Sequence, residues 1–236
     1  MKDLLSNVSI QVNENIYLKD PESSDLGKKI IEGSVNLIDE IGFEKFTFKK
    51  LSMQINSTEA SVYRYFESKH KLLLYITSWY WAWLEYQLVF NTANIKSPRK
   101  RLIRAIKLLT EEIGLGEVIG IMNTEKLYRI VISESSKSFL VKEVDQVNQE
   151  GAFMAYKNLV GRVAEIVKEI EPKYRFPRML ISTIIEGAHN QRFFVQHLPK
   201  LTDTNESEDL IPKFYEDLVL SAVNIEKRNN KHQHAD

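Results

Sequence analysis

Residues 47–69 constrain the fold of this chain more than any other stretch, because two short amphipathic segments there flank a polar interruption. The first segment carries apolar residues at helical spacing, at Phe48, Leu51 and Ile55. In the second, Val62 and Phe66 lie four residues apart and therefore share one helix face. Asn56–Ser57 separates the segments, and asparagine tolerates a left-handed turn better than any residue except glycine. The stretch predicts a helix-turn-helix whose second helix is sized to enter a DNA major groove.

Two threonines are placed to begin these helices. Thr47 precedes the first helix and Thr58 the second, and an N-cap threonine accepts a hydrogen bond from the backbone of the first turn. The second helix turns outward five side chains that the core does not need: Glu59, Ala60, Ser61, Tyr63 and Arg64. Hydroxyl, phenol and guanidinium groups at the exposed start of a short helix suit phosphates and base edges. We therefore predict a DNA interface at this helix.

The order of residues here resembles the DNA-binding domain of the TetR family of bacterial repressors. The resemblance rests on the threonine that opens the first helix, the Tyr-Arg-Tyr-Phe run at 63–66, Lys69 three residues later and the Leu72–Leu73 pair. It extends upstream to Leu26. The chain departs from the family at Ser52, where alanine is usual, at Asn56–Ser57, where glycine-valine is usual, and at Ala60, where glycine is frequent. Because Ser57 replaces an apolar side chain, we expect a functional but less tightly packed turn.

The resemblance implies a role for each matched side chain. Four would hold DNA phosphates: Thr47, Lys49, Tyr65 and Lys69. Six would face the major groove: Thr58, Glu59, Ala60, Ser61, Tyr63 and Arg64. Glu59 is the most informative of these, because a carboxylate at a base edge can accept only from a donor such as the cytosine amino group.

The overall charge offers no long-range attraction for DNA, because 32 basic and 32 acidic residues cancel. A local patch is present between residues 43 and 72. There, three acids (Glu44, Glu59 and Glu67) are outnumbered by the basic residues Lys45, Lys49, Lys50, Arg64, Lys69 and Lys71. A dimer would double this local excess of positive charge.

Cysteine is absent from the chain, which excludes disulfides, thiolate metal sites and cysteine nucleophiles and fits a reducing cytoplasm. Residues 1–20 lack the apolar core of a signal peptide. We therefore predict a cytoplasmic protein.

The whole chain is predicted to be all-α. An N-terminal arm (1–22), in which Val8, Ile10 and Val12 alternate, precedes a three-helix DNA-binding domain (23–72) whose first helix ends at Gly42. A long helix from 68 to 90 joins it to a larger helical ligand-binding and dimerisation domain (73–226), followed by a polar tail (227–236). Within the larger domain we expect helices at 98–113, 124–133, 138–170, 178–197 and 209–225, and no strands.

An effector cavity is predicted in the larger domain. Gly114, Gly116 and Gly120 interrupt an apolar stretch and suit the floor of a cavity. The residues expected to line it are Trp79, Trp83, Tyr86, Met122, Tyr128 and Tyr156. Aromatic residues of a buried helix are more often core than ligand contacts, so both interpretations stay open. The lining predicts a small, largely apolar effector.

The last two helices are the predicted dimer interface, since members of the resembling family dimerise through a four-helix bundle at this end. Apolar residues on them would supply its faces: Leu180, Ile184, Phe194, Leu210, Phe214 and Leu218.

Other classes of protein fit less well. Glu186 and His189 form a Glu-x-x-His pair, half of a di-iron site, but a second pair is absent, so we predict no metal or cofactor. The chain has no phosphate-binding glycine loop and no nucleophile elbow, which disfavours an enzyme. The long helix is interrupted by Glu85 and Gln87, which disfavours a membrane span.

The leading interpretation is a homodimeric transcriptional repressor that a small effector releases from double-stranded operator DNA. One alternative is an all-α small-molecule or metal-binding protein, a carrier or oxidase, without sequence-specific DNA binding. Another is a regulator that has lost its ligand and binds DNA constantly.

Overall fold

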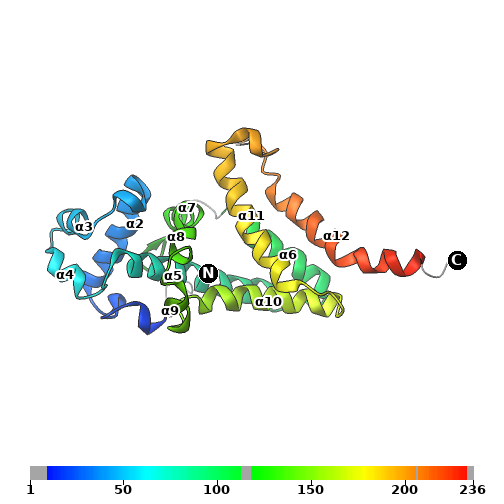
Figure 1. Ribbon diagram of the computed structural model, residues 1–236, viewed down its shortest axis with the longest axis horizontal. Helices are drawn as coiled ribbons and strands as arrows, with labels where there is room; N and C mark the ends of the chain where they lie inside the picture. Colours follow the sequence, from blue (N-terminus) through cyan, green and yellow to red (C-terminus); the bar gives the residue numbers. More distant parts are fainter. Residues whose placement is uncertain (1–9, 113–117, 206, 233–236) are drawn as a thin grey trace. The chain divides into compact units, whose positions relative to one another are not determined.

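The computed structural model describes residues 10–112, 118–205 and 207–232, and these are almost entirely helical (Figure 1). The helices form two compact units. The first contains residues 10–83 and 118–156, and the second contains residues 84–112 and 157–232. The all-α prediction is thus confirmed. No helix of the described residues is both long and apolar enough to cross a bilayer.

The first unit begins with two single-turn 3-10 helices, η1 (Glu14–Ile16) and η2 (Pro21–Ser23), and continues with α2 (Asp25–Lys45), α3 (Phe48–Gln54) and α4 (Glu59–Tyr63). Ser24 caps α2 by accepting a hydrogen bond from the Gly27 N–H at 3.1 Å. Near its end α2 is kinked at Gly42, whose φ of 76° and ψ of 156° are non-helical. Glycine adopts that backbone without a Cβ penalty. The first helix is predicted to end at Gly42, and the regular helix is interrupted there before one further turn to Lys45.

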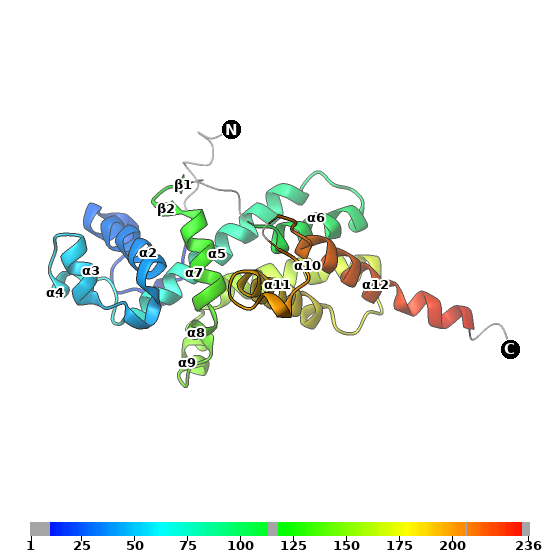
Figure 2. The same cartoon turned by 90° about the horizontal axis from the view of Figure 1, so that it is seen from above.

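The three helices pack around a small apolar core. Phe46, Leu51, Val62 and Phe66 are completely buried, and α3 lies against both α2 and α4 (Figure 2). At Gly33 the side chains of Ile55 and Leu51 pack directly on the α2 backbone, because a Cβ there would lie 2.6 Å from Cγ2 of Ile55. The predicted three-helix unit is therefore present, with the predicted inward residues in its core.

Helix α5 (Lys69–Thr92) is buried on nearly every side from Leu72 to Trp81. In the first unit it is accompanied by a two-residue hairpin, β1 (Val118–Ile119) and β2 (Met122–Asn123), and by α7 (Thr124–Glu134), α8 (Ser136–Phe139) and α9 (Val144–Gln149). Helix α7 packs along α2. The second unit consists of the end of α5 with α6 (Pro98–Thr110), α10 (Met154–Ile170), α11 (Pro177–His197), η3 (Pro199–Leu201) and α12 (Ile211–His232), and α6, α11 and α12 pack on one another.

Several predicted elements differ from the structure. The single helix expected over 138–170 is wrong: α8, α9 and α10 replace it, and Gly151 has a φ of 86° where the chain turns between α9 and α10. The prediction of no strands is also wrong, since β1 and β2 pair around Gly120, whose φ is 61°. The last helix continues to His232, past the expected end at 225 and into the predicted tail. Val8, Gly114 and Gly116 lie outside the described residues.

Candidate nucleic-acid interface

The turn between α3 and α4 has the geometry of a Schellman motif. Asn56 has a φ of 51°, the only positive φ of a non-glycine residue in the described part of the chain. Its N–H donates to the Met53 carbonyl at 3.3 Å, and the Ser57 N–H donates to the Ser52 carbonyl at 2.8 Å. These two bonds satisfy carbonyls that would otherwise be left open at the end of α3. The prediction of a left-handed residue at Asn56 is confirmed.

Three side chains form a hydrogen-bonded chain at the start of α4. The Thr58 hydroxyl oxygen accepts from the Ser61 N–H at 3.2 Å and lies 2.9 Å from the Ser61 hydroxyl oxygen. Arg64 donates from Nη2 to that Ser61 oxygen at 3.2 Å. Because Ser61 accepts from Arg64, its own proton is free to go to Thr58. The proton of the exposed Thr58 hydroxyl is then available for an acceptor outside the protein, such as a phosphate oxygen.

The predicted groove-facing residues differ in exposure. Thr58, Ala60 and Arg64 are exposed and Glu59 is half-buried. Tyr63 is 47% exposed and its ring packs edge-on against Phe48, with centroids 4.9 Å apart, so α3 holds it in place. Ser61 is only 9% exposed, and its described contacts are with Thr58 and Arg64.

The predicted phosphate contacts fall into two pairs. Thr47 and Lys49 are exposed at the start of α3, where Thr47 accepts from the Lys50 N–H at 3.2 Å and so caps the helix as predicted. Tyr65 is buried, and its hydroxyl lies 2.7 Å from the Ser24 hydroxyl. Lys69 is half-buried and donates from Nζ to the backbone carbonyls of residues at the end of α2, at 3.1 to 3.4 Å: Phe43, Glu44 and Phe46.

Several cations of the patch make contacts within the protein, and one of them is paired with an acid. Lys50 donates from Nζ to the Lys45 carbonyl at 2.8 Å, and Lys71 pairs with Glu150 at 2.7 Å. The hydrogen bond from Lys71 lowers the pKa of the Glu150 carboxyl. The exposed cations of the patch are Lys45, Lys49, Lys50 and Arg64, and of these Lys50 and Arg64 also donate hydrogen bonds within the domain.

This geometry coincides with a family match. The model of the bacterial regulatory proteins of the tetR family matches residues 30–76, which run from α2 through α3 and α4 into α5. Residues 30–76 are a TetR-type DNA-binding domain. No curated protein matches the chain.

Solved structures with the TetR-type fold resemble the chain over most of its length. The fatty acid degradation regulator FadR from Bacillus halodurans is 12% identical, covers 84% of this chain and 94% of its own, and has a TM-score of 0.57. A putative transcriptional regulator from Saccharomonospora viridis, solved with choline, is 17% identical over 84% and 97%, with a TM-score of 0.56. AibR, solved with isovaleryl coenzyme A and operator DNA, is 15% identical over 81% and 94%, with a TM-score of 0.53.

The aromatic residues predicted to line an effector cavity are mostly buried core of the TetR-type fold. Trp79, Trp83, Met122 and Tyr128 are at most 6% exposed. The rings of Trp81 and Tyr156 lie 4.5 Å apart, whereas Tyr86 is 37% exposed at the surface. The pocket that the structure describes in the second unit is lined by other residues, so the six predicted contacts stay a prediction.

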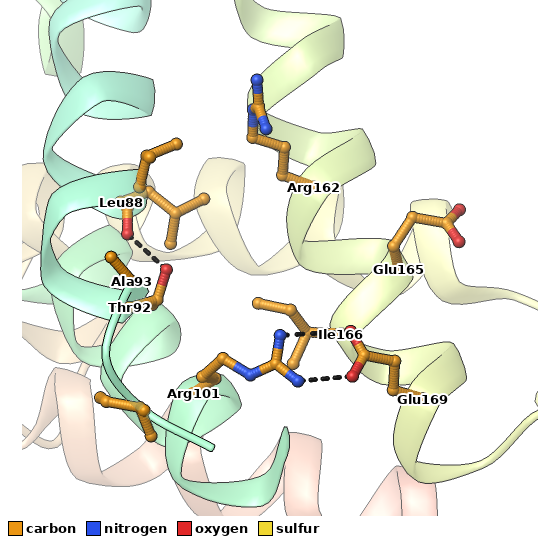
Figure 3. A pocket seen from close by; sticks show the side chains of 10 residues that line it. Leu88, Thr92, Ala93, Arg101, Arg162, Glu165, Ile166 and Glu169 are labelled. Carbon is orange, nitrogen blue, oxygen red and sulfur yellow. Dashed lines mark hydrogen bonds and ion pairs between the residues drawn. The ribbon is translucent and has the colours of Figure 1, made fainter. Parts of the chain in front are cut away.

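That pocket lies between the end of α5, α6 and α10 and has a volume of about 390 Å³ (Figure 3). Its wall is apolar at Leu88, Val89, Ile95 and Ile166. Arg101 pairs with Glu169 at the pocket, with Nη1 to Oε1 at 3.3 Å and Nη2 to Oε2 at 2.5 Å. Thr92, Arg162 and Glu165 also line the pocket, so its surface is about equally polar and apolar and suits a ligand that has both an apolar and a polar part. The sequence alone does not predict this pocket, because Arg101 and Glu169 are 68 positions apart in the chain.

The predicted dimer residues also differ in exposure. Leu210, Phe214 and Leu218 are 36%, 58% and 42% exposed and follow one another at four-residue spacing, Leu210 just before α12 and the other two on it. Leu180 and Phe194 on α11 are half-buried. Ile184 is completely buried within its own chain, so it supports α11 from inside.

The Glu186 and His189 pair lies on α11, where His189 is 4% exposed. Burial, with a smaller contribution from the nearby Arg192 guanidinium, lowers the pKa of His189 to about 4. Among the described residues, no group of three or more His, Cys, Asp or Glu side chains is placed to hold a metal ion.

Proposed function

We propose that the chain is a ligand-responsive transcriptional repressor that binds operator DNA as a homodimer through α3 and α4. The observation that carries the proposal is the coincidence of the TetR family match with a capped α3–α4 unit whose outward side chains the core does not use. Thr58, Ala60, Tyr63 and Arg64 supply hydroxyl, methyl, phenol and guanidinium groups for bases and phosphates. Lys49 and Thr47 supply phosphate contacts at the start of α3.

The ligand response is supported by proteins of the same fold. AibR was solved with both isovaleryl coenzyme A and operator DNA, and the Saccharomonospora viridis regulator with choline. For this chain we propose a small effector with a largely apolar body. Two places could receive it: the aromatic cluster of Trp79, Trp83, Tyr86, Met122, Tyr128 and Tyr156, and the pocket beside Arg101 and Glu169.

The two effector sites can be separated by substitution. A Val89→Trp variant fills the described pocket from an exposed wall position, and it should abolish effector-dependent release if the pocket is the site. A Tyr86→Ala variant alters the surface-exposed member of the aromatic set. A library of small molecules screened by thermal shift would identify a ligand first, because a molecule that binds only the folded protein raises its melting temperature.

For the homodimer we propose contacts through α11 and α12. Exposed Leu210, just before α12, and exposed Phe214 and Leu218 on it form an apolar stripe, and burial of this stripe against a second copy would remove it from water. A cytoplasmic location and the absence of enzymatic activity follow from this proposal, since the matched family consists of transcriptional regulators.

The test is fluorescence anisotropy of the purified protein with the DNA upstream of its own gene, at two salt concentrations and with excess random competitor. Saturable binding that survives the competitor is the expected result, because base contacts give an advantage over nonspecific DNA. Binding that the competitor abolishes at once would overturn the proposal and leave only the charge patch.

A further inference from the structure

The backbone of Phe43 is held on both sides by ionic side chains that come from outside the first helix. Its N–H donates to the Glu134 carboxylate, from the last residue of α7, at 3.1 Å. Its carbonyl accepts from Lys69 Nζ, from the first residue of α5, at 3.1 Å. Lys69 Nζ also lies 4.7 Å from the centre of the Phe43 ring. Phe43 is 6% exposed, so these bonds lie in a nearly dry environment.

Burial and an ion pair with Lys137 fix the Glu134 carboxylate in place for its contact with Phe43. It is a buried acid, with only 9% of its side chain exposed, and its second carboxylate oxygen pairs with Lys137 at 2.7 Å. Lys137 pairs in turn with Glu44 at 3.1 Å. Burial acts to lower the pKa of Lys137, but the Glu134 and Glu44 carboxylates raise it by more. A buried carboxylate that holds a backbone N–H and a cation has little freedom to move away.

The position of Phe43 makes these contacts consequential for DNA binding. Gly42 on one side has a left-handed backbone, and Thr47, the N-cap of α3, follows four residues later. A displacement of this segment therefore changes where α3 begins and where α4 points. Helix α7 is itself fixed to α2, because Arg129 pairs bidentately with Asp39 at 2.8 Å and Lys126 donates to Asn36 at 2.7 Å.

We propose that Glu134 is a positioning residue for operator binding: through the Phe43 N–H it transmits the position of α7 to the start of the helix-turn-helix. The inference rests on the proposed function, because it concerns the DNA affinity of that domain. Lys69, at the start of α5, donates to the Phe43 carbonyl, so that α5 and α7 together hold the backbone of Phe43. Movement of the last turn of α7, beyond the Arg129–Asp39 pair, lengthens the Glu134–Phe43 bond and releases the segment that orients α3.

The first measurement uses the unaltered protein. Hydrogen–deuterium exchange is followed in peptides covering α7, with and without an operator duplex. Because coupling between two sites is reciprocal, operator binding should slow exchange in α7, although α3 and α4 make the DNA contacts. If the protein binds the duplex and exchange in α7 stays unchanged, the proposal is overturned. This measurement uses only the unaltered protein and therefore does not depend on whether a variant folds.

The second measurement compares variants by anisotropy well below their melting temperatures. Glu134→Ala should weaken operator binding by about tenfold, within the range of one hydrogen bond to a charged group. Glu134→Gln keeps an oxygen that can accept from Phe43 and should retain near-normal binding. Glu125→Ala removes an acid of the same helix that pairs with Arg129, but it leaves the bidentate Arg129–Asp39 pair in place, so this variant should bind like the unaltered protein.

The outcomes separate the two proposals. If the unaltered protein fails to bind its upstream DNA, the proposed function fails, and the role of Glu134 with it. If the unaltered protein binds this DNA and Glu134→Ala binds it equally well, the positioning role of Glu134 is wrong and the proposed function stands. A Glu134→Ala variant with a lower melting temperature, normal affinity and normal slowing in α7 would assign Glu134 to stability only.

Discussion

Asn56 is the non-glycine residue whose backbone limits substitution most in the described DNA-binding domain. Its φ of 51° is unfavourable for a β-branched side chain, which costs about 1–2 kcal/mol in the left-handed region. Asn56→Val should lower the free energy of unfolding by about that amount. Urea denaturation measures it, with Gln54→Val as the control, since Gln54 is an exposed residue at the end of α3 with helical backbone. Equal losses for both variants would contradict the role of the turn.

Glu59 should determine base preference more than affinity. It is half-buried in the first turn of α4, and a carboxylate there can accept from a base amino group but repels phosphates. Glu59→Ala should therefore relax the sequence preference in a randomised operator library while affinity for the best site changes little. Glu67→Ala, an exposed acid beyond the end of α4, is the matched control. An unchanged preference for Glu59→Ala would refute the assignment.

His189 should make the protein less stable in mild acid. Its folded pKa is about 4, against about 6.5 in the unfolded chain, so above pH 6.5 both states are neutral and His189 contributes no pH dependence. As the pH falls from 6.5 to 4, only the unfolded state gains the proton, which removes up to about 3 kcal/mol of stability. Urea midpoints at pH 7, 6 and 5 should fall less steeply for His189→Gln than for the unaltered protein. Parallel curves would show that His189 is not the source.

At the scale of elements, the parts predicted correctly are those with local causes. The α3–turn–α4 unit follows from threonine caps, apolar residues three and four apart and an asparagine that accepts a positive φ, all within residues 47–66. The starting positions of α6 and α11 follow from prolines, since α6 begins at Pro98 and α11 at Pro177. The outward position predicted for Ser61 is wrong, because its hydroxyl bonds to Thr58 and Arg64, three residues away on either side. Lys69 is assigned to DNA by the resemblance, and its bond to the Phe43 carbonyl depends on a neighbour 26 residues away.

The parts that could not be predicted depend on contacts between distant segments. The break between α9 and α10 is stabilised by the N-terminal arm, where Asn15 donates to the Glu150 carbonyl at 3.0 Å. The pocket forms only because α10 brings Glu169 to Arg101 on α6. Likewise, the Glu134–Phe43 bond joins residues far apart in the chain. No periodicity within one segment carries that information.

The stripe on α12 allows a direct test of dimerisation. Phe214 is 58% exposed, so Phe214→Asp removes little from the core of a single chain but places a charge where a partner would pack. We expect a monomer in sedimentation at micromolar concentration, with a far-ultraviolet circular dichroism spectrum like that of the unaltered protein. Lys213→Ala alters an exposed polar neighbour on the same helix and should remain dimeric. A dimeric Phe214→Asp protein would place the interface elsewhere.

The whole molecule should use dimerisation to reach its operator affinity. One DNA-binding domain offers few exposed cations, namely Lys45, Lys49, Lys50 and Arg64, and so binds a half-site weakly. Two units joined in a dimer act together, and the second contact then occurs at a high effective concentration. Such an operator should be a palindrome whose half-sites lie a whole number of helical turns apart.

The monomeric variant separates this effect from base recognition. Phe214→Asp should lose about 10²-fold or more in affinity for the full operator, yet bind a duplex with one half-site as tightly as the unaltered protein does. Inserting half a helical turn between the half-sites should reduce the unaltered protein to the same level, because the second unit then faces the wrong side of the duplex. Anisotropy with the three duplexes measures all of these affinities. If the monomer binds the full operator as tightly as the dimer, a single domain supplies the affinity and the stripe on α12 has another purpose.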